Sequence, residues 1–426
     1  MVCGGKNACG AAQTAKNCVV VGNGRELVEK AAGSGCVFVE QSERKGTGHA
    51  VMMSADFLRS NKSSDVIVLC GDAPFVNEKT ITDAYNAHKR QGNCVTVVTA
   101  ELDEPTGYGR IVYKNGEFSA IVEQADATDE IKAIKEVNSG IFWFKCEFLM
   151  EALAKLTCEN KQGEYYLTDV VSIAKSENKR VGTFVAENAD VVLGANDRKS
   201  LAALNEIARM RIIEKHWANG VDIPVTDGVV IDDTVKIGAD TTILAGTMLT
   251  GGTVVGEGCV IGPNTVVDGS EIGSGTEIRS SYVYGSKIKN NVKIGPFAHI
   301  RPGCVIDDNV KIGDFVEIKN SNIGEKTAVA HLTYVGDSDV GRGVNFGCGV
   351  VTVNYDGCRK HRTTIGNDAF IGCNTNLVAP VKVGDSAYTA AGSTITEDVP
   401  DNALAIARSR QQNKPDWVCG KEMKKK

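Results

Sequence analysis

A histidine and several cationic residues in the second half of the chain could perform proton transfer on a phosphorylated substrate. His331 lies in the segment Ala330-His331-Leu332-Thr333-Tyr334, where we expect the six-residue repeat to be interrupted. Arg301 and Lys319 are eighteen residues apart, and Lys360 follows further on. Such a cluster of cations suits a phosphate ester, and a neutral histidine beside it could act as general base toward an amine or hydroxyl. A histidine alone in such a segment is more often a bystander, so the prediction depends on the cluster.

The repeat itself predicts how these residues are positioned. Aliphatic residues recur every six positions, first over 231–267 and again over 288–318: Ile231, Ile237, Ile243, Leu249, Val255, Ile261 and Val267, then Ile288, Ile294, Ile300, Ile306, Ile312 and Ile318. Six residues suit one flat side and one corner of a three-sided solenoid, whose repeats bury their apolar side chains only by stacking. Eighteen residues are three repeats, so Arg301 and Lys319 are expected on the same side. Asn345 is expected to face the same region, and the segment Asn354-Tyr355-Asp356-Gly357 to leave the coil as a loop.

Three glycine-containing loops in the first half of the chain could bind a nucleotide. They are Gly46-Thr47-Gly48-His49, Gly71-Asp72 and Gly107-Tyr108-Gly109-Arg110-Ile111. Glycine lets the backbone approach a phosphate or a base, and a carboxylate at the end of a buried strand is a common partner of a metal-bound nucleotide. Each loop alone is an ordinary turn in most proteins, and the occurrence of all three in order is more specific.

Alternating strand and helix patterns predict that an α/β sheet positions these loops. We expect strands at Val19–Val21, Cys36–Val39, Val66–Cys70 and Cys94–Ala100, and helices at Arg25–Ala32, Val51–Arg59 and Lys79–Arg90. The apolar run that ends at Gly71-Asp72 is typical of a buried parallel strand, and ligands are expected at the carboxyl ends of the strands. No convincing strand precedes residue 18, and neither a Gly-x-Gly-x-x-Gly fingerprint nor a P-loop is present, so the sheet is expected to lack its first strand.

These patterns divide the chain into four parts. We predict an α/β domain over 1–195, a connecting helix within 196–220, a β-solenoid over 221–407 and a polar tail over 408–426. A chain of 426 residues is too long for one ordinary core, in agreement with this division.

Composition narrows the partners and the compartment. The net charge of -6 argues weakly against nucleic-acid binding, and no apolar stretch or leader pattern indicates a membrane or secreted protein. The 14 cysteines are scattered, without zinc-type spacing, and several take places where an aliphatic residue fits, such as Cys70, Cys259 and Cys304. We therefore expect a cytoplasmic protein with reduced thiols.

Motifs along nearly the whole chain resemble one bifunctional bacterial family, the N-acetylglucosamine-1-phosphate uridyltransferase / glucosamine-1-phosphate N-acetyltransferases. The motifs that carry the resemblance occur in the family's order: Gln41, Gly46-Thr47-Gly48-His49-Ala50, Gly71-Asp72-Ala73-Pro74, Gly107-Tyr108-Gly109-Arg110-Ile111, Glu123, Asn138-Ser139-Gly140-Ile141, Asn196, Pro296-Phe297-Ala298, Arg301-Pro302-Gly303, Glu317-Ile318-Lys319, His331-Leu332-Thr333-Tyr334, Asn354-Tyr355-Asp356-Gly357, Ala390-Ala391-Gly392 and Ala405-Ile406-Ala407-Arg408. The resemblance implies a Rossmann-like nucleotidyltransferase domain, a linker helix and a left-handed parallel β-helix. It also implies a homotrimer with acetyl-transfer sites between adjacent β-helices.

The resemblance implies acetyl transfer from acetyl-CoA to the 2-amino group of glucosamine 1-phosphate. His331 is the implied general base. The residues implied to hold the sugar phosphate are Arg301, Lys319, Tyr334 and Asn345. Those implied to bind acetyl-CoA are Cys348, Asn354, Tyr355, Cys373, Ala391 and Arg408. The family commonly has serine in place of Cys373, and the loss of that hydroxyl contact is expected to weaken CoA binding by about 1 kcal/mol at most.

The second implied reaction is uridylyl transfer from UTP to N-acetylglucosamine 1-phosphate, with release of pyrophosphate. The implied ligands of Mg²⁺ are Asp72 and Asn196. The residues implied to contact the nucleotide and sugar are Gln41, Gly46, Thr47, Gly109, Glu123, Asn138 and Asn196. The family opens with a strand and a Gly-rich phosphate loop that this sequence lacks, so we expect little uridyltransferase activity from the chain as given.

Two other interpretations are weighed against this one. In the first, the chain is a monofunctional sugar-phosphate nucleotidyltransferase whose β-helix only trimerises. In the second, it is a scaffold without enzymatic activity. The set of His331, Arg301, Lys319 and Tyr334 argues against both, because a purely structural β-helix needs none of these side chains.

Overall fold

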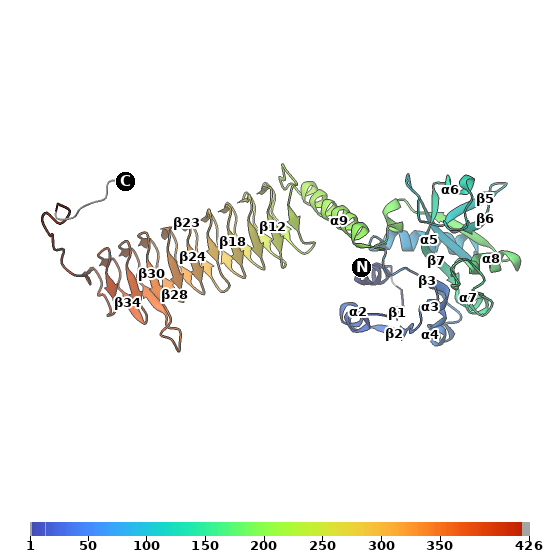
Figure 1. The fold of residues 1–426 in the computed structure, drawn as a ribbon, viewed down its shortest axis with the longest axis horizontal. Helices are drawn as coiled ribbons and strands as arrows, with labels where there is room; N and C mark the ends of the chain where they lie inside the picture. The colour runs from blue at the N-terminus through green and yellow to red at the C-terminus, as the bar shows by residue number, and fades with distance from the viewer. Residues whose placement is uncertain (1, 13, 420–426) are drawn as a thin grey trace. The chain divides into compact units, whose positions relative to one another are not determined.

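The computed structural model describes residues 2–12 and 14–419, and the chain separates into two compact units, Met1–Asn205 and Glu206–Lys426. The division falls within one long helix, α9 (Arg198–Ala218). Each unit is described by itself (Figure 1). No helix in the described part of the chain has the length and apolar character to cross a membrane.

The first unit contains two separate sheets. The larger sheet has the strand order β6-β5-β7-β4-β8, and β3 pairs with the other part of β7. Its strands are β3 (Asp65–Val68), β4 (Val95–Glu101), β5 (Arg110–Lys114), β6 (Glu117–Val122), β7 (Glu136–Lys145) and β8 (Val181–Val185). The smaller sheet pairs β1 (Asn17–Val21) with β2 (Cys36–Glu40) in parallel.

Helices pack around both sheets of this unit. They are α1 (Val2–Ala11), α2 (Arg25–Ala32), α3 (Thr47–Met52), α4 (Ala55–Arg59), α5 (Glu78–Gln91), α6 (Asp129–Lys132), α7 (Cys146–Leu153), α8 (Asp169–Ser176) and the 3-10 helix η1 (Ala189–Val192). Two clusters of buried side chains form the core, one of which includes Val95, Phe144 and Leu149. The strand and helix alternation expected from the sequence is therefore present.

Three details of the expected α/β unit are wrong. The single expected sheet is two sheets, because β1 and β2 pair with each other and, among the described residues, not with the larger sheet. The single helix expected over Val51–Arg59 is two helices, because the Ser54 hydroxyl donates to the Val51 carbonyl at 2.6 Å and ends α3. The strand that starts at Asp65 ends at Val68, and its four residues are half-buried rather than buried. The strand pairs with antiparallel β7, not with a parallel neighbour, among the described residues.

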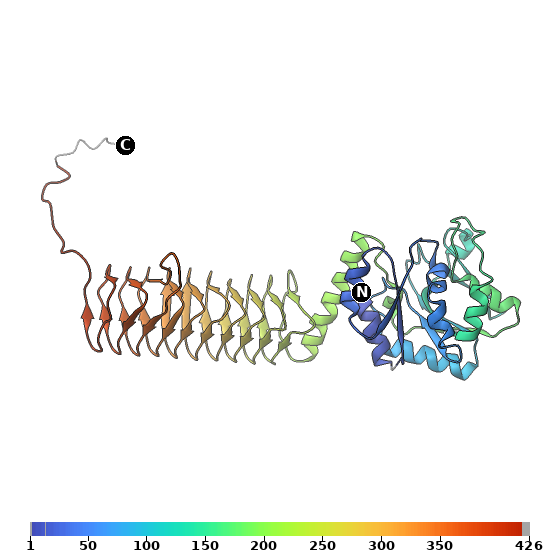
Figure 2. The ribbon, with the colours of Figure 1, turned by 90° about the horizontal axis from the view of Figure 1, so that it is seen from below.

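The second unit is a parallel β-helix with three flat faces (Figures 1 and 2). Face 1 consists of β9 (Val230–Ile231), β12 (Met248–Thr250), β15 (Val266–Asp268), β18 (Tyr282–Tyr284), β21 (His299–Ile300), β24 (Glu317–Lys319), β27 (Tyr334–Gly336), β30 (Val351–Val353), β33 (Asn376–Val378) and β36 (Thr394–Ile395). Face 2 consists of β10 (Lys236–Ile237), β13 (Val254–Val255), β16 (Glu271–Ile272), β19 (Lys287–Ile288), β22 (Val305–Ile306), β25 (Asn322–Ile323), β28 (Ser338–Val340), β31 (Thr363–Ile365) and β34 (Val381–Val383). Face 3 consists of β11 (Thr242–Ile243), β14 (Val260–Ile261), β17 (Glu277–Ile278), β20 (Lys293–Ile294), β23 (Lys311–Asp314), β26 (Ala328–His331), β29 (Asn345–Phe346), β32 (Phe370–Ile371), β35 (Tyr388–Thr389) and β37 (Leu404–Ala405).

The six-residue register determines the core of this unit. Its aliphatic side chains point inward, and Ile243, Ile261 and Ile318 are fully buried. Small hydroxyl residues at the corners join one coil to the next. The Thr241 hydroxyl donates to the Gly256 carbonyl at 2.8 Å and accepts from the Cys259 amide at 3.0 Å. Each coil is therefore held in register with its neighbours by backbone and side-chain hydrogen bonds.

The expected interruption of the repeat at His331 is wrong. Ile323, Val329 and Val335 are six residues apart and all buried, so the six-residue spacing runs through this segment. The spacing shortens by one residue before this segment, between Ile318 and Ile323. His331 is therefore the end of an ordinary face 3 strand, β26, and its position in the fold, not a defect of the coil, distinguishes it.

Cysteine burial agrees in part with the expected role as small hydrophobes. Cys259 and Cys304 are both 1% exposed in the β-helix core, and Cys94 and Cys146 are buried in the first unit. From Cys9 onward, every cysteine whose side chain the structure describes is a free thiol, but several are exposed at the surface, including Cys373. The expected role as small buried hydrophobes therefore does not apply to these exposed cysteines.

Candidate functional site

Two cationic residues occupy matching positions on neighbouring coils of the β-helix. Arg301 directly follows β21, and Lys319 ends β24, the next strand on face 1. The Arg301 amide donates to the Ile318 carbonyl at 2.8 Å, which fixes this register. Both residues therefore lie at the corner between faces 1 and 2, here called corner 1–2, as their eighteen-residue spacing predicted.

Lys360 joins this pair from a loop between β30 and β31. Contact with the Lys360 side chain lowers the pKa of Lys319, and partial burial and the charges of Lys360 and Arg301 act in the same direction. Arg301 also donates to Glu317 at 2.9 Å. Cations this close repel one another, and a dianionic phosphate would relieve that repulsion.

The loop that carries Lys360 is held by one carboxylate. Asp356 accepts from the amides of Cys358 at 2.7 Å and Arg359 at 2.6 Å, and it contacts His361 Nε2 at 2.7 Å. These hydrogen bonds keep the pKa of Asp356 far below its usual range. The loop therefore leaves the coil at Asn354-Tyr355-Asp356-Gly357, as expected from the sequence, and returns with Lys360 at corner 1–2.

Tyr334 and Asn354 connect the middle of face 1 to this corner. Tyr334 starts β27, and its hydroxyl accepts from Asn354 Nδ2 at 3.3 Å. Asn354 Nδ2 also donates to Asp337 Oδ2 at 2.5 Å, and Asp337 accepts from Asn320 at 2.6 Å. Tyr355 is exposed beside them, and its hydroxyl donates to the Gly357 carbonyl. A polar surface thus extends from the centre of face 1 to the cations.

His331 lies at the opposite edge of face 1, at the corner between faces 3 and 1 (corner 3–1). Its Nδ1 is 2.7 Å from Asp314 Oδ1, and this hydrogen bond lowers the pKa of Asp314. With Nδ1 donating to a carboxylate, Nε2 keeps its lone pair and can accept a proton. Sequence reasoning missed Asp314, because eighteen-residue spacing pairs His331 with Gly313, whereas the slipped register pairs it with Asp314 on the preceding coil.

Four of the residues implied to bind acetyl-CoA continue the His331 column along corner 3–1. The register Asn345↔Phe370 and Phe346↔Ile371 places Cys348 level with Cys373 two residues later. The following pairs place Ala391 level with Cys373, and Arg408 one residue beyond this column. The column therefore runs from His331 through both cysteines to Ala391, with Arg408 near its end. Asn354 and Tyr355, in contrast, belong to corner 1–2.

Asn345 is not brought to this surface within one chain. It is the first residue of β29 on face 3, where it pairs with Ala328, three residues before His331. Its exposed side chain therefore belongs to a different face from Lys319 and Tyr334. The expectation that Asn345 faces the same region is not met by the single chain.

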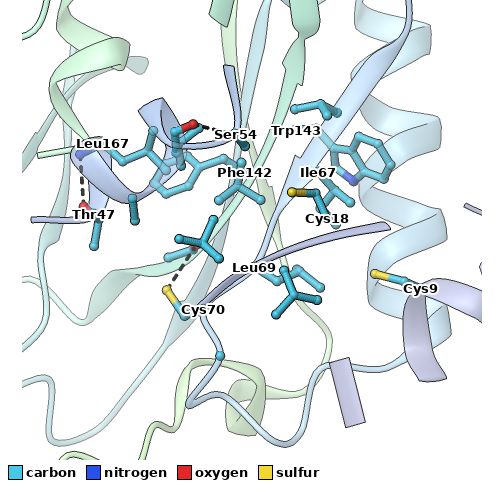
Figure 3. Close-up of a pocket in the computed structure, with 18 of the residues that line it drawn as sticks. Cys9, Cys18, Thr47, Ser54, Ile67, Leu69, Cys70, Phe142, Trp143 and Leu167 are labelled. Carbon is cyan, nitrogen blue, oxygen red and sulfur yellow. Dashed lines mark hydrogen bonds between the residues drawn. The ribbon is translucent and has the colours of Figure 1, made fainter. Parts of the chain in front are cut away.

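The loops singled out in the first unit surround one cavity of about 1570 Å³. Its walls include the facing strands β1 and β3, so it occupies the space between the two sheets. Figure 3 shows Ile67, Leu69 and Cys70 of this region together with Cys18 and Trp143. Burial, with a contribution from Asp72, raises the pKa of the Cys70 thiol to about 11. Of the residues implied for uridylyl transfer, those that line the cavity are Gln41, Thr47, Asp72, Glu123, Asn138 and Asn196.

Backbone packing explains Gly46, one of the two glycines among the implied nucleotide and sugar contacts. Gly46 has a φ of 98°, and a Cβ there would be 2.6 Å from the Tyr165 carbonyl oxygen. Gly46 also accepts from Gln41 Nε2 at 3.2 Å, and Thr47 accepts from the Leu167 amide at 3.1 Å (Figure 3). These contacts fix the loop at the edge of the cavity, although Gly46 itself does not line it.

Gly109, Glu123 and Asn138 form a second group at the cavity. The Asn138 amide donates to the Gly109 carbonyl at 2.9 Å, and a Cβ on Gly109 would be 3.2 Å from Glu123 Oε2. Glu123 accepts from the Thr168 hydroxyl at 3.2 Å, and burial raises its pKa. A polar end of the cavity is thus assembled from β5, β6 and β7.

Asp72 and Asn196 could share a metal ion. The backbone carbonyl of Asp72 accepts from the Ala195 amide at 3.2 Å, next to Asn196, and a Cβ on Gly194 would be 3.3 Å from Asp72 Oδ2. Mg²⁺ is usually held by one or two carboxylates and completes its coordination with water and substrate phosphates. Asp72 and Asn196 fit that requirement. Among the side chains that the structure describes, no three from His, Cys, Asp or Glu gather as a complete protein cage.

Comparison with known proteins identifies both units. Residues 15–217 match the nucleotidyl transferase family, and residues 234–269, 285–320 and 362–397 match the bacterial transferase hexapeptide repeat. The bifunctional protein GlmU of Acetivibrio thermocellus is 49% identical over 406 residues, which cover 95% of this chain and 88% of that protein. The bifunctional protein GlmU of Caldanaerobacter subterraneus subsp. tengcongensis is 50% identical over 401 residues, which cover 94% of this chain and 87% of that protein.

The chain belongs to the bifunctional GlmU family. The resemblance noted in the motifs is therefore confirmed, and so is the fold of a nucleotidyltransferase domain, a long helix and a left-handed β-helix of hexapeptide repeats. As a GlmU-type protein, the chain is an enzyme with an acetyltransferase and a nucleotidyltransferase assignment. This result favours the bifunctional interpretation over a monofunctional nucleotidyltransferase or a scaffold.

Proposed function

We propose that face 1 of the β-helix binds glucosamine 1-phosphate and transfers an acetyl group to its 2-amino group. The observation that supports this proposal is the placement of three cations at one edge of the face and the His331–Asp314 pair at the other. The strand between them, β27, is three residues long, or about 10 Å. A sugar phosphate laid across the face can thus place its phosphate at Arg301, Lys319 and Lys360 and its amine toward His331.

The chemistry of this arrangement is acyl transfer with general-base assistance. The amine nitrogen attacks the thioester carbonyl of acetyl-CoA, and His331 Nε2 takes the proton that the nitrogen loses. The C–S bond breaks and CoA leaves as its thiol form after protonation. Asp314 holds the Nδ1–H tautomer and stabilises the imidazolium that forms. Tyr334 is proposed to contact the sugar ring between the two edges.

Acetyl-CoA is proposed to bind along corner 3–1. Cys348, Cys373 and Ala391 are small residues that continue the His331 column, which leaves room for an extended pantetheine arm. Arg408 is proposed to meet a CoA phosphate near the end of the column. Asn354 and Tyr355 lie at the other corner of their own chain, so they reach the same CoA only if a second copy brings that corner close.

A homotrimer is proposed for the same reason. Asn345 faces away from the sugar-phosphate surface of its own chain, and a neighbouring copy could bring face 3 beside it. Three large apolar side chains, Phe297, Phe315 and Leu332, follow one another at corner 3–1 with 60%, 57% and 58% of their surface exposed. All three have positive φ, a conformation that bulky residues rarely adopt. Burial of this apolar edge against another copy would compensate for both features.

The first unit is proposed to transfer uridylyl groups at the cavity between its sheets. Asp72 and Asn196 would hold Mg²⁺, which neutralises phosphate charge when bound. Gln41, Gly46 and Thr47 are proposed to contact the uracil. Gly109, Glu123 and Asn138 are proposed to contact the N-acetylglucosamine moiety. The expectation of little uridyltransferase activity from the chain as given stays a prediction.

The division of labour follows the expected domain boundaries. We assign uridylyl transfer to residues 1–195 and acetyl transfer to residues 221–407, with 196–220 as linker and 408–426 as tail. Residues 420–426 of that tail lie outside the described residues. A cytoplasmic location also stays a prediction.

Replacement of the general base tests the acetyl-transfer proposal. His331→Ala should lower glucosamine-1-phosphate-dependent CoA release by about 10²- to 10⁴-fold, because proton removal from the amine loses its acceptor. The release of CoA from acetyl-CoA can be followed with a thiol reagent, and the thermal unfolding midpoint controls for folding. Full activity of the folded variant would contradict the proposal and favour a structural β-helix.

A further inference from the structure

Two thiols follow His331 on consecutive coils of corner 3–1. β29 pairs with β32 through Asn345↔Phe370 and Phe346↔Ile371, so Cys348 and Cys373 are level two residues later. The hydrogen bond from the Asn374 amide to the Cys348 carbonyl, 2.8 Å long, shows that the pairing continues through the corner. Cys348 is half-buried and Cys373 is exposed, so a small reagent can reach the pair.

The spacing of the coils suits a covalent link between these thiols. Hydrogen-bonded strands are about 4.8 Å apart, inside the range of about 4.4–6.8 Å that a disulfide requires between Cα atoms. Side chains at this column position already touch across coils, since His331 and Asp314 are 2.7 Å apart. The Cys373 sulfur leans toward the coil that carries Cys348, because a Cβ on Gly347 would be 2.9 Å from it.

Another cysteine pair in neighbouring strands lacks this geometry. Cys18 and Cys36 belong to the parallel strands β1 and β2, but Cys18 pairs with Val37 and Cys36 pairs with Asn17. Successive side chains of a strand point to opposite faces, so these two thiols are offset by one residue and do not face each other, although Cys36 is close enough to add to the effect of burial in raising the pKa of Cys18. Two cysteines on neighbouring strands therefore do not always have the geometry for a disulfide. The register at corner 3–1 provides that geometry for Cys348 and Cys373.

We infer that Cys348 and Cys373 form an oxidisable dithiol at the acetyl-transfer site. The oxidant is a low-molecular-weight disulfide such as oxidised glutathione. One protein thiolate attacks the small disulfide and releases one small thiol, and the second protein thiolate then displaces the other. Two protein thiols are oxidised to one disulfide, while one small disulfide is reduced to two thiols, with both protons passing to the released thiols.

Closure of this disulfide blocks acetyl transfer. This consequence rests on the proposed function, in which the column from His331 to Arg408 takes acetyl-CoA. The bond fixes both sulfurs over the rung next to His331, where the thioester must approach Nε2. We expect at least a tenfold loss of acetyltransferase activity on oxidation and its recovery with dithiothreitol.

Peptide mapping tests the bond independently of any activity. The full chain is equilibrated with oxidised glutathione, its remaining thiols are alkylated, and it is digested with trypsin. The expected product links peptide 343–359, which carries Cys348 and Cys358, to peptide 363–382, which carries Cys373. The link should persist in Cys358→Ser and vanish in Cys348→Ser. Absence of the linked peptide, or its loss in Cys358→Ser alone, would overturn the inference.

Activity measurements test the consequence. The ratio of oxidised to reduced activity is compared within each variant, so that any change in CoA affinity cancels. Cys373→Ser should keep its activity after oxidation, whereas Cys158→Ser, a surface control in the first unit, should lose activity like the unmodified chain. A mapped disulfide with unchanged activity would refute the block. An inactive reduced chain would instead count against the proposed acetyl transfer, while the mapped disulfide would still stand.

Discussion

The β-helix and the α/β unit position their functional residues in opposite ways. In the β-helix, strand register sets the positions, and Asp314, His331, Cys348 and Cys373 are consecutive members of a single column. In the α/β unit, the candidate residues come from separate loops around a cavity of about 1570 Å³ between two sheets. Periodic hydrogen bonding fixes the first site, and the second depends on how the sheets and loops are held apart.

The largest expected effect is a loss of activity at the cavity of the α/β unit, and it tests whether that site works independently of the β-helix. Asp72→Asn removes the one carboxylate that we assign to Mg²⁺, and it should lower any Mg²⁺-dependent formation of UDP-N-acetylglucosamine by about 100-fold or more, because the metal supplies several kcal/mol of charge stabilisation. Release of pyrophosphate from UTP measures this activity. Acetyl transfer by the same variant serves as the control and should not change. A parallel loss of both activities would contradict the proposal that the two reactions occur at independent sites.

Lys319→Ala tests the group of cations at corner 1–2. Loss of one charge-assisted hydrogen bond, worth about 1.5–3 kcal/mol, should raise the KM for glucosamine 1-phosphate about 10- to 100-fold. Lys287→Ala is the matched control, because Lys287 is an exposed lysine on face 2 that pairs only with the exposed Glu271 in the described structure. An equal effect of both substitutions on KM would show that net charge, not position, matters.

Matched core substitutions compare the packing of the two regions directly. Ile318 is fully buried in the β-helix, so Ile318→Ala should lower the free energy of unfolding of that unit by about 2–5 kcal/mol. Ile67 is half-buried in β3 and lines the cavity, so Ile67→Ala should cost about 1 kcal/mol in its own unit. Denaturant titrations followed by tryptophan fluorescence report on Trp143 in one unit and Trp217 in the other. An equal decrease in the free energy of unfolding for both variants would show that side chains lining the cavity pack as tightly as those in the β-helix core.

The smallest expected effect concerns the pH dependence at corner 1–2. Contact with Lys360 lowers the pKa of Lys319, so Lys319 loses its charge at a lower pH than an ordinary lysine. Lys360→Gln should raise KM for glucosamine 1-phosphate a few-fold near neutral pH. It should also shift the alkaline rise of KM to higher pH, because the pKa of Lys319 returns toward its usual value of about 10.4. A profile measured between about pH 8 and 10 that does not move would refute the contact.

The sequence predicted the β-helix better than the α/β unit. Inward side chains recur every six residues, so Ile243 and Ile318 could be placed in a core, and Arg301 and Lys319 on one side, without a structure. The six-residue rule alone pairs His331 with Gly313, and the slip of one residue between Ile318 and Ile323 places Asp314 there instead. In the α/β unit, the run from Val66 to Cys70 predicted a buried parallel strand. Its burial depends on neighbours that the run itself does not specify.

The sequence by itself determined which residue types recur and at what spacing, because a solenoid repeats local contacts of fixed length. It also determined the family, through motifs that extend along nearly the whole chain. Only the tertiary structure decided that His331 has a carboxylate partner, that Asn345 faces away from the sugar-phosphate surface, and that two thiols are level beside the catalytic corner. These facts depend on which residues of distant coils and strands become neighbours, and that is set by hydrogen-bonded register rather than by local preference.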